Sequence, residues 1–277
     1  MPPHRIHAPA GARDRLGLIF VRSLIIAPAD NDKKLAEALA SGADALVVDL
    51  DSVAPGARAS ARGAAVRFLR EARARGGWPA LIGRVTPLSG SGTDFDLDSV
   101  MPAAPDAIML PKSLGGASVQ QLSAKLAVRE AEHGLADGAT KIIAEATDSA
   151  RAVFGMASYR ISSVRLIGLV WSAQSLSADI GAETHLDSSG AYAGPYRLAR
   201  DLTLLAASAA GVAAIDAIFA DVRDVEGLRA EAILARRDGF AGKLAIDPAQ
   251  ARVINDVFRS RSVRRTGERR PNATYES

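Results

Sequence analysis

Short apolar segments alternate with longer amphipathic segments along most of the chain. Each apolar segment has the length of a buried strand, and they cover residues 18–28, 45–50, 80–85, 107–111, 141–146, 165–171, 212–219 and 242–246. Amphipathic segments with helical periodicity lie between most of them, at 30–42, 58–77, 119–134, 195–211, 226–239 and 248–259. This order of strand and then helix is typical of parallel strands joined by crossover helices.

The number of strand-and-helix units decides between two α/β architectures. Eight units in about 240 residues fit a (β/α)8 barrel better than an open doubly wound sheet, which usually has about five or six strands. The first apolar segment is followed by "APADND" and not by a GxGxxG turn, and "SGSG" at 89–92 lacks the lysine of a phosphate-binding loop. We therefore predict an α/β fold, a (β/α)8 TIM barrel over residues 17–259, between a disordered tail at 1–16 and a basic, flexible tail at 260–277.

Composition narrows the classes of function. The chain is 48% hydrophobic and 23% charged, and no apolar run approaches the roughly 18 residues that span a bilayer, so we expect a cytoplasmic protein without a membrane partner. Cysteine is absent, which excludes thiolate nucleophiles, and the four histidines lack a metal-binding spacing. The net charge is +3 and aromatic residues make up 5%, which does not suggest nucleic-acid binding, so the arginine-rich tail is expected to be solvated.

Three basic residues lie where barrel enzymes place their active sites, near the carboxyl ends of strands. Arg22 and Arg84 each interrupt an apolar segment, and a buried arginine must either face an anion or form an ion pair. Lys112 follows Pro111 at the end of the fourth segment. It is either a surface lysine or a ligand-binding residue at a fixed strand exit.

Acidic residues follow two other strands. Asp49 and Asp51 alternate in strand register, so they project to the same face if the strand extends that far. They can bind a hard cation, hold an arginine or cap the next helix. Glu145 and Asp148 lie at the fifth strand end, where Asp148 is either a helix cap or a metal ligand.

The connection after the sixth strand is the longest inside the barrel. It runs from Ser172 to Pro195 as "SAQSLSADIGAETHLDSSGAYAGP". Because connections of this length in compact domains are commonly lids or binding loops, we expect it to cover the barrel mouth.

Several motifs together resemble one family. They are "RSLIIAP", "SGADALVVDL" followed by "SVAPGAR", "GRVTPL", "PDAIMLPK", "AVFGMASY" and the run from Gly190 to Asn255. Over about residues 20–258 the chain resembles the citrate lyase β-subunit-like branch of the HpcH/HpaI aldolase family. The resemblance implies a TIM barrel, a homotrimer or hexamer, and cleavage or formation of carbon–carbon bonds in 3-hydroxyacyl-CoA compounds such as malyl-CoA and citryl-CoA.

The resemblance also implies roles for particular residues. Retro-aldol cleavage beside a thioester leaves an enolate, so the family uses Mg²⁺ held by two carboxylates and an arginine that stabilises the developing negative oxygen. Arg84 matches that arginine. Arg22 matches an arginine near the region that binds substrate and CoA phosphate, and Lys112 is a second candidate for binding substrate or CoA. Asp148 matches the first metal carboxylate when the chains are aligned through "AVF". Alternatives for that ligand are Glu145, which requires a gap, and the pair Asp49 and Asp51.

The second metal carboxylate is missing from its expected place. The family usually reads "GAEDLAADLG" where this chain reads "SAQSLSADIG", so Gln174 and Ser175 occupy the acidic positions. Other departures are a shortened "DLDSV", no glutamate soon after "LPK", Thr86 in place of asparagine, and Asp247-Pro248 in place of His-Pro. Since Mg²⁺ prefers carboxylate oxygens, its binding should be weak or absent.

Two hypotheses follow. The first is a carbon–carbon lyase that acts on a 3-hydroxyacyl-CoA or a related hydroxy acid by Mg²⁺-assisted cleavage, with a departed metal site. The second is a catalytically inactive or altered member that binds an acyl-CoA or a small hydroxy or keto acid, or that pairs with an active paralogue.

Overall fold

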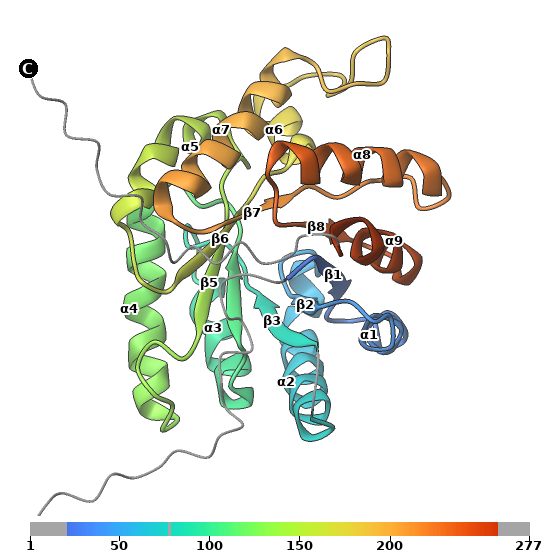
Figure 1. Cartoon of the computed structure of the whole chain (residues 1–277). Coiled ribbons are helices and arrows are strands. Elements are labelled where there is room, and N and C mark those ends of the chain that lie inside the picture. The colour runs from blue at the N-terminus through green and yellow to red at the C-terminus, as the bar shows by residue number, and fades with distance from the viewer. Residues whose placement is uncertain (1–20, 77–78, 260–277) are drawn as a thin grey trace, which may run out of the picture.

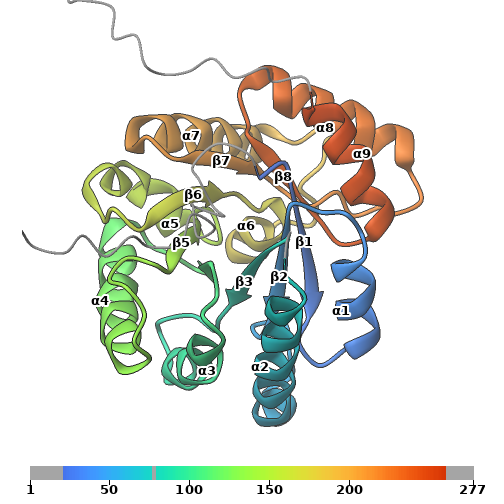
Figure 2. The same ribbon diagram turned by 60° about the horizontal axis from the view of Figure 1, so that its bottom comes forward.

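The computed structural model describes residues 21–76 and 79–259, and eight parallel strands form a closed barrel in that part of the chain. Consecutive strands pair in order, and the last strand pairs with the first, as Figure 2 shows close to end-on. The predicted TIM barrel is confirmed, while the two predicted tails lie outside the described residues. The strands are β1 (Ser23–Pro28), β2 (Ala45–Asp49), β3 (Ala80–Arg84), β4 (Ala107–Leu110), β5 (Lys141–Glu145), β6 (Leu166–Val170), β7 (Ala213–Asp216) and β8 (Gly242–Ala245).

Helices surround the strands as an outer ring (Figure 1). Six of them coincide with the amphipathic segments predicted from the sequence, and α3, α5 and α6 are additional. None of the described helices is long and apolar enough to span a bilayer. The helices are α1 (Asp32–Leu39), α2 (Arg58–Ala74), α3 (Gly92–Val100), α4 (Gly116–Glu132), α5 (Ala150–Gly155), α6 (Ala173–Ile180), α7 (Gly194–Ala210), α8 (Val225–Asp238) and α9 (Pro248–Phe258).

Alternation along the strands separates the barrel interior from the layer beneath the helices. Because successive side chains of a strand point to opposite faces, residues two positions apart share a face. Asp49, Arg84 and Glu145 each lie two positions beyond an interior residue, so they form the layer above the apolar interior at the carboxyl end. The interior apolar group includes Leu24, Val47, Ile82, Met109, Ile143 and Leu244.

The connection after β6 differs from the prediction of one long loop. Its first third is the helix α6, whose amino end is capped by the hydroxyl of Ser172 accepting from the backbone N–H of Ser175. The helix ends at Gly181, which takes a left-handed conformation with φ of 67°. The expectation of a loop from Ser172 to Pro195 was therefore wrong over residues 173–180, and a serine cap with a terminal glycine was the signal for the helix.

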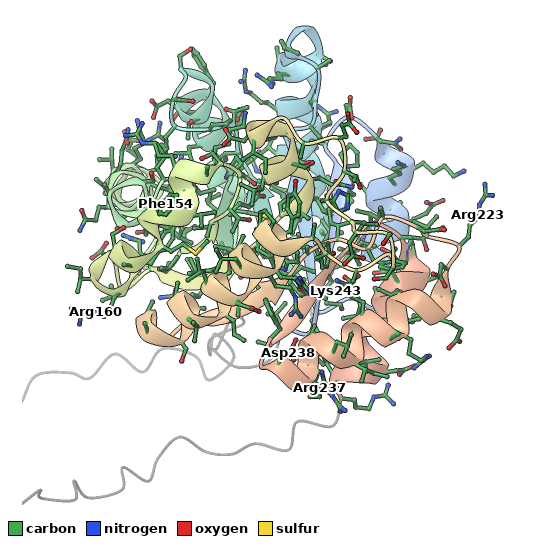
Figure 3. The ribbon with its side chains drawn as sticks, turned by 90° about the horizontal axis from the view of Figure 1, so that it is seen from above. Phe154, Arg160, Arg223, Arg237, Asp238 and Lys243 are labelled. Atoms are coloured by element: carbon green, nitrogen blue, oxygen red, sulfur yellow. The ribbon has the colours of Figure 1, made fainter. Side chains whose placement is uncertain are left out.

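A buried ion cluster fixes the outer helices to β7 and β8. The ammonium of Lys243 is fully buried and contacts the carboxylates of Asp216, at 2.8 Å, and Glu231 of α8. Asp216 also accepts from Trp171 at 2.7 Å and from Arg200 of α7 at 3.2 Å. Burial alone raises the pKa of Asp216, but the two cations lower it below its usual value. Figure 3 shows Lys243 within the molecule.

Removal of Lys243 should be strongly destabilising. Lys243→Met leaves Asp216 and Glu231 without their shared cation in a buried place, and we expect the free energy of unfolding to fall by about 3–5 kcal/mol. Urea denaturation measures this loss. The control is Lys33→Met on α1, where an exposed lysine lies 3.9 Å from Glu37 and a change of roughly 0.5 kcal/mol or less is expected. Equal losses in the two variants would contradict a special role for the cluster.

Candidate functional site

Arg84 is the centre of the barrel mouth and contacts three carboxylates. Its Nε and Nη2 donate to the two carboxylate oxygens of Glu145 at 2.6 and 3.0 Å. Its Nη1 donates to Asp49 at 3.0 Å and lies 3.2 Å from a carboxylate oxygen of Asp51. Of the three alternatives for Asp49 and Asp51, which were cation binding, an ion pair with an arginine and helix capping, the structure shows ion pairs with Arg84.

The local structure makes these contacts possible. Asp49 and Arg84 are directly opposite each other in the pairing of β2 with β3, and both face the interior. The backbone turns after β2 so that the N–H groups of Asp51 and Ser52 donate to Asp49 Oδ1. This turn brings the Asp51 carboxylate back toward the guanidinium of Arg84.

Burial and charge oppose each other in this group. Burial raises the pKa of Glu145 to about 7, with Arg84 opposing the shift and the neighbouring carboxylate of Asp148 adding to it. Burial also raises the pKa of Asp51. For Arg84, burial alone lowers the pKa, but the carboxylates of Glu145, Asp49 and Asp51 raise it above its ordinary value. The guanidinium therefore stays charged, with much of its field offset by its own partners.

Asp148 lies beside Glu145 and fixes the exit of β4. One carboxylate oxygen, Oδ2, accepts from the backbone N–H of Lys112 at 2.7 Å. Lys112 has a φ of 50°, which is uncommon for a residue with a side chain, and this charge-assisted hydrogen bond helps to hold it there. The Lys112 side chain is exposed at the rim. Ser149, and not Asp148, caps the following helix α5.

The other carboxylate oxygen of Asp148, Oδ1, does not accept a hydrogen bond from the backbone as Oδ2 does. Within residues 21–76 and 79–259, Asp148 Oδ1 is buried and has no hydrogen-bond partner. Buried polar atoms without a partner are rare in folded proteins, and they indicate strain or a missing ligand group. This atom is one that inspection of the sequence did not single out.

The residues at the family's second acidic position belong to the start of α6. Thr147 and Ser172 tie β5 to β6, because the backbone N–H of Ser172 donates to the Thr147 hydroxyl at 2.7 Å. The Ser172 hydroxyl in turn lies 3.1 Å from the hydroxyl of Ser175. The side chain of Gln174 is exposed. Thr147 and Ser172 were missed as site residues, and their place directly after two strand ends was the signal available.

Arg22 is not part of this group. It directly precedes β1, whereas Asp49 pairs with the last residue of that strand, Pro28. The six residues of β1 span about 20 Å at roughly 3.3 Å per residue, so Arg22 lies at the amino end of the barrel. There it forms a two-point ion pair with Asp44, with both distances at 2.7 Å. Of the two alternatives for Arg22, an anion-binding residue or a member of an ion pair, the structure shows the ion pair.

The donor set at the mouth does not fit a Mg²⁺ ion held by two carboxylates. In the described part of the chain, no three histidine, cysteine or acidic side chains form a group that could hold a metal ion. Both oxygens of Glu145 accept from Arg84, and Ser175 offers a hydroxyl that already contacts Ser172. Among the described residues, Asp148 Oδ1 is a fully buried carboxylate oxygen of the site without a hydrogen-bond partner, and one such carboxylate is a weak basis for Mg²⁺.

The raised pKa of Glu145 predicts a pH dependence of stability. Between about pH 4.5 and 7 the folded protein keeps a proton on Glu145 that the unfolded chain has released. Its contribution to stability is therefore complete at the acidic end and is lost as the pH rises toward 7. The free energy of unfolding should fall by up to about 1.4 kcal/mol per pH unit over this interval because of this group.

Urea denaturation at several pH values tests this against Glu145→Gln, which removes the titrating group. The variant should show a flatter dependence by about one proton. Identical slopes for the wild type and the variant would show that Glu145 has an ordinary pKa.

Comparison with known proteins places this geometry in a family. The model of the HpcH/HpaI aldolase/citrate lyase family matches residues 22–248. The citrate lyase subunit beta of Leuconostoc mesenteroides subsp. cremoris is 30% identical over 86% of this chain and 76% of its own length. A (3S)-malyl-CoA thioesterase of Cereibacter sphaeroides is also 30% identical, over the same shares of the two chains.

Solved structures agree with this result. Protein CitE from Mycobacterium tuberculosis, in complex with magnesium, acetoacetate and coenzyme A, is 30% identical with a TM-score of 0.71. The match covers 88% of this chain and 82% of that one. A family model that spans most of the barrel and relatives of this similarity lead to one conclusion: the chain belongs to the HpcH/HpaI aldolase/citrate lyase family.

Proposed function

We propose that this protein binds a 3-hydroxyacyl-CoA of the malyl-CoA or citryl-CoA type, or a related hydroxy acid, at the barrel mouth, and that it is a carbon–carbon lyase with a weakened metal site. The observation that carries the proposal is the position of Arg84. It is the last residue of β3 and contacts Asp49 and Glu145, which end β2 and β5, at the end of the barrel where barrel enzymes have their active sites. The magnesium, acetoacetate and coenzyme A of the CitE complex support the ligand class.

Arg84 and Lys112 have different tasks in this proposal. A guanidinium held rigidly by carboxylates is preorganised to stabilise an oxygen that becomes negative during cleavage, although its partners reduce its field. Lys112 is exposed at the rim, where its ammonium can contact CoA phosphates without desolvation. Arg22 does not share this role because it is paired with Asp44 at the opposite end of the barrel.

Mg²⁺ would supply Lewis-acid polarisation of the substrate oxygens in the relatives' manner. The residues of this chain do not fit such an ion, because Asp148 contributes one free oxygen and Ser175 contributes a hydroxyl. We therefore assign the substrate-orienting contacts to the protein's own groups.

A second candidate function is a non-catalytic or altered protein that binds the same acyl-CoA or acid, or that pairs with an active paralogue. Ser175 favours it, because the side chain at the family's second carboxylate position is committed to the hydroxyl contact with Ser172. A homotrimer or hexamer remains part of both proposals.

Cleavage assays separate the two candidates. The wild type and the double variant Gln174→Glu/Ser175→Asp are compared on malyl-CoA and citryl-CoA during a Mg²⁺ titration. We expect the double variant to gain at least about tenfold in kcat/KM, because a second carboxylate restores a Mg²⁺ site. The control is Arg84→Lys in the double variant, which should lower activity again because lysine cannot contact two carboxylates as a planar fork.

A wild type as fast as the restored variant would contradict a weakened metal site. If no form cleaves either thioester although both bind, the second candidate is correct. If neither thioester binds, both candidates fail.

A further inference from the structure

A group of large apolar side chains lies exposed on one side of the helix ring. It belongs to α5, to α7, and to the short 3-10 helix η3 (Met156–Ile161) with the segment just after it. Both ribbon views show α5 and α7 next to each other (Figures 1 and 2), and η3 packs against both. We call this group the apolar face; its members are Phe154 at 90% exposure, Ile161 at 73%, Val164 at 94%, Leu198 at 58% and Leu205 at 64%.

The elements beneath the apolar face are fixed from the inside. The buried hydroxyl of Tyr159 donates to Ser113 Oγ at 2.9 Å, and the hydroxyl of Thr203 on α7 lies 3.9 Å from the sulfur of Met156 on η3. A Cβ atom at Gly116 would collide with the backbone carbonyl oxygen of Ser158, so α4 and η3 are in close contact. Because the inner positions of η3 and α7 are already filled, the exposed apolar side chains have no place in the core of their own chain.

Helix α7 has two apolar stripes, although one is enough to pack a helix on its barrel. The inner stripe consists of buried residues, which are Tyr196, Ala199, Thr203 and Ala207. The outer stripe consists of Leu198, Leu202 and Leu205, at spacings of four and three residues. Such a narrow stripe is the kind of seam by which one helical surface packs against another. The outer stripe therefore suits a second helical surface.

Charges of opposite sign lie at the two borders of the apolar face. Arg160 is on η3 and Asp201 is on α7; both are exposed, and neither forms an ion pair within residues 21–76 and 79–259. Asp201 points away from η3, because Thr203 contacts η3 and residues two positions apart on a helix point in nearly opposite directions. Figure 3 shows Arg160 at the outer edge on the same side of the molecule as Phe154.

Size and charge together fit a second copy of this chain. The five side chains expose roughly 600 Å² of apolar surface, which is the upper end for a typical monomer and near the about 800 Å² per partner of a standard interface. In a two-fold contact the same surface is used by both copies. An axis parallel to α7 lays the α7 border of each copy on the η3 border of the other, so that Asp201 meets Arg160 of the second copy twice.

We propose that two copies of this chain associate through the apolar face about a two-fold axis, with Phe154, Leu198 and Leu205 at the centre of the contact. A contact of this kind makes a dimer from two single chains or a hexamer from two trimers. The apolar face lies on the outer helices, so this inference does not rest on the ligand proposed for the barrel mouth.

Light scattering coupled to size-exclusion chromatography of the full chain tests the contact. The double variant Phe154→Lys/Leu205→Lys should have half the mass of the wild type, because two ammonium groups from each copy would have to be desolvated beside each other. Both side chains are exposed, so the melting temperature of the separated form should show that the barrel is still folded. The matched control is Phe95→Lys on α3, where a phenylalanine that is 58% exposed lies outside the apolar face, and it should keep the mass of the wild type.

A charge reversal tests the orientation of the two copies. Arg160→Asp places two carboxylates opposite each other at each border, and it should raise the dissociation constant of the two-fold contact about fivefold. Arg160→Asp/Asp201→Arg restores opposite charges and should return the constant to within about twofold of the wild-type value. Sedimentation equilibrium measures both constants.

Each outcome decides a separate point. A wild type that is a monomer or a trimer has no two-fold contact and would overturn the proposal, as would a Phe154→Lys/Leu205→Lys variant that keeps the wild-type mass or a Phe95→Lys variant that loses as much. A fall to one third of the mass would show a ring contact in place of the two-fold one. Failure of the second charge change to restore association would overturn the orientation. Should the double lysine variant not fold, the charge reversal and its restoration still decide the proposal.

Discussion

Closure of the strand ring is the constraint on which the rest of the molecule depends. The pairing of β8 with β1 leaves no free edge, and because every neighbouring pair is parallel, all eight strands run in one direction. As a result, the carboxyl ends of β2, β3 and β5, which are far apart in the sequence, meet at one mouth. The pairing of Asp49 with Arg84 and the contact of Arg84 with Glu145 follow directly from that register.

Two buried charge groups use the ring in different ways. The group around Lys243 lies on its outer side, where strand alternation turns Asp216 toward α7 and α8, and there cations and carboxylates satisfy each other. The group around Arg84 lies inside and has more carboxylates than cations. A structural cluster has no need of a ligand, whereas the inner group retains an unsatisfied atom, Asp148 Oδ1. This asymmetry distinguishes the binding site from the support that surrounds it.

Two of the positions at which the sequence differs from the motifs that the resemblance implies have structural partners of their own. Thr86, in place of the usual asparagine, donates through its hydroxyl and its backbone N–H to Asp96 of α3. Asp247, in place of histidine, caps α9 by accepting from the backbone N–H of Ala249. Asp179, the first charge after β6 and a residue that matches the family's pattern, accepts from the backbone N–H of Ala150 at the start of α5. These contacts stabilise the loops around the mouth and add no metal ligand to it.

The sequence by itself determined the barrel, because strand length, helical periodicity and the count of eight units are local properties. It also located Arg84, Asp49, Asp51, Glu145 and Asp148 at strand ends. It could not decide whether Arg22 joins them, since Arg22 and Arg84 both interrupt apolar segments, whereas in the structure Arg22 precedes the first residue of β1 and Arg84 is the last residue of β3. Nor could it show that α6 replaces a third of the expected loop, or that one oxygen of Asp148 accepts from the backbone N–H of Lys112 while the other has no hydrogen-bond partner among the described residues. Those outcomes depend on which atoms of distant segments meet when the ring closes, and only the tertiary structure decides that.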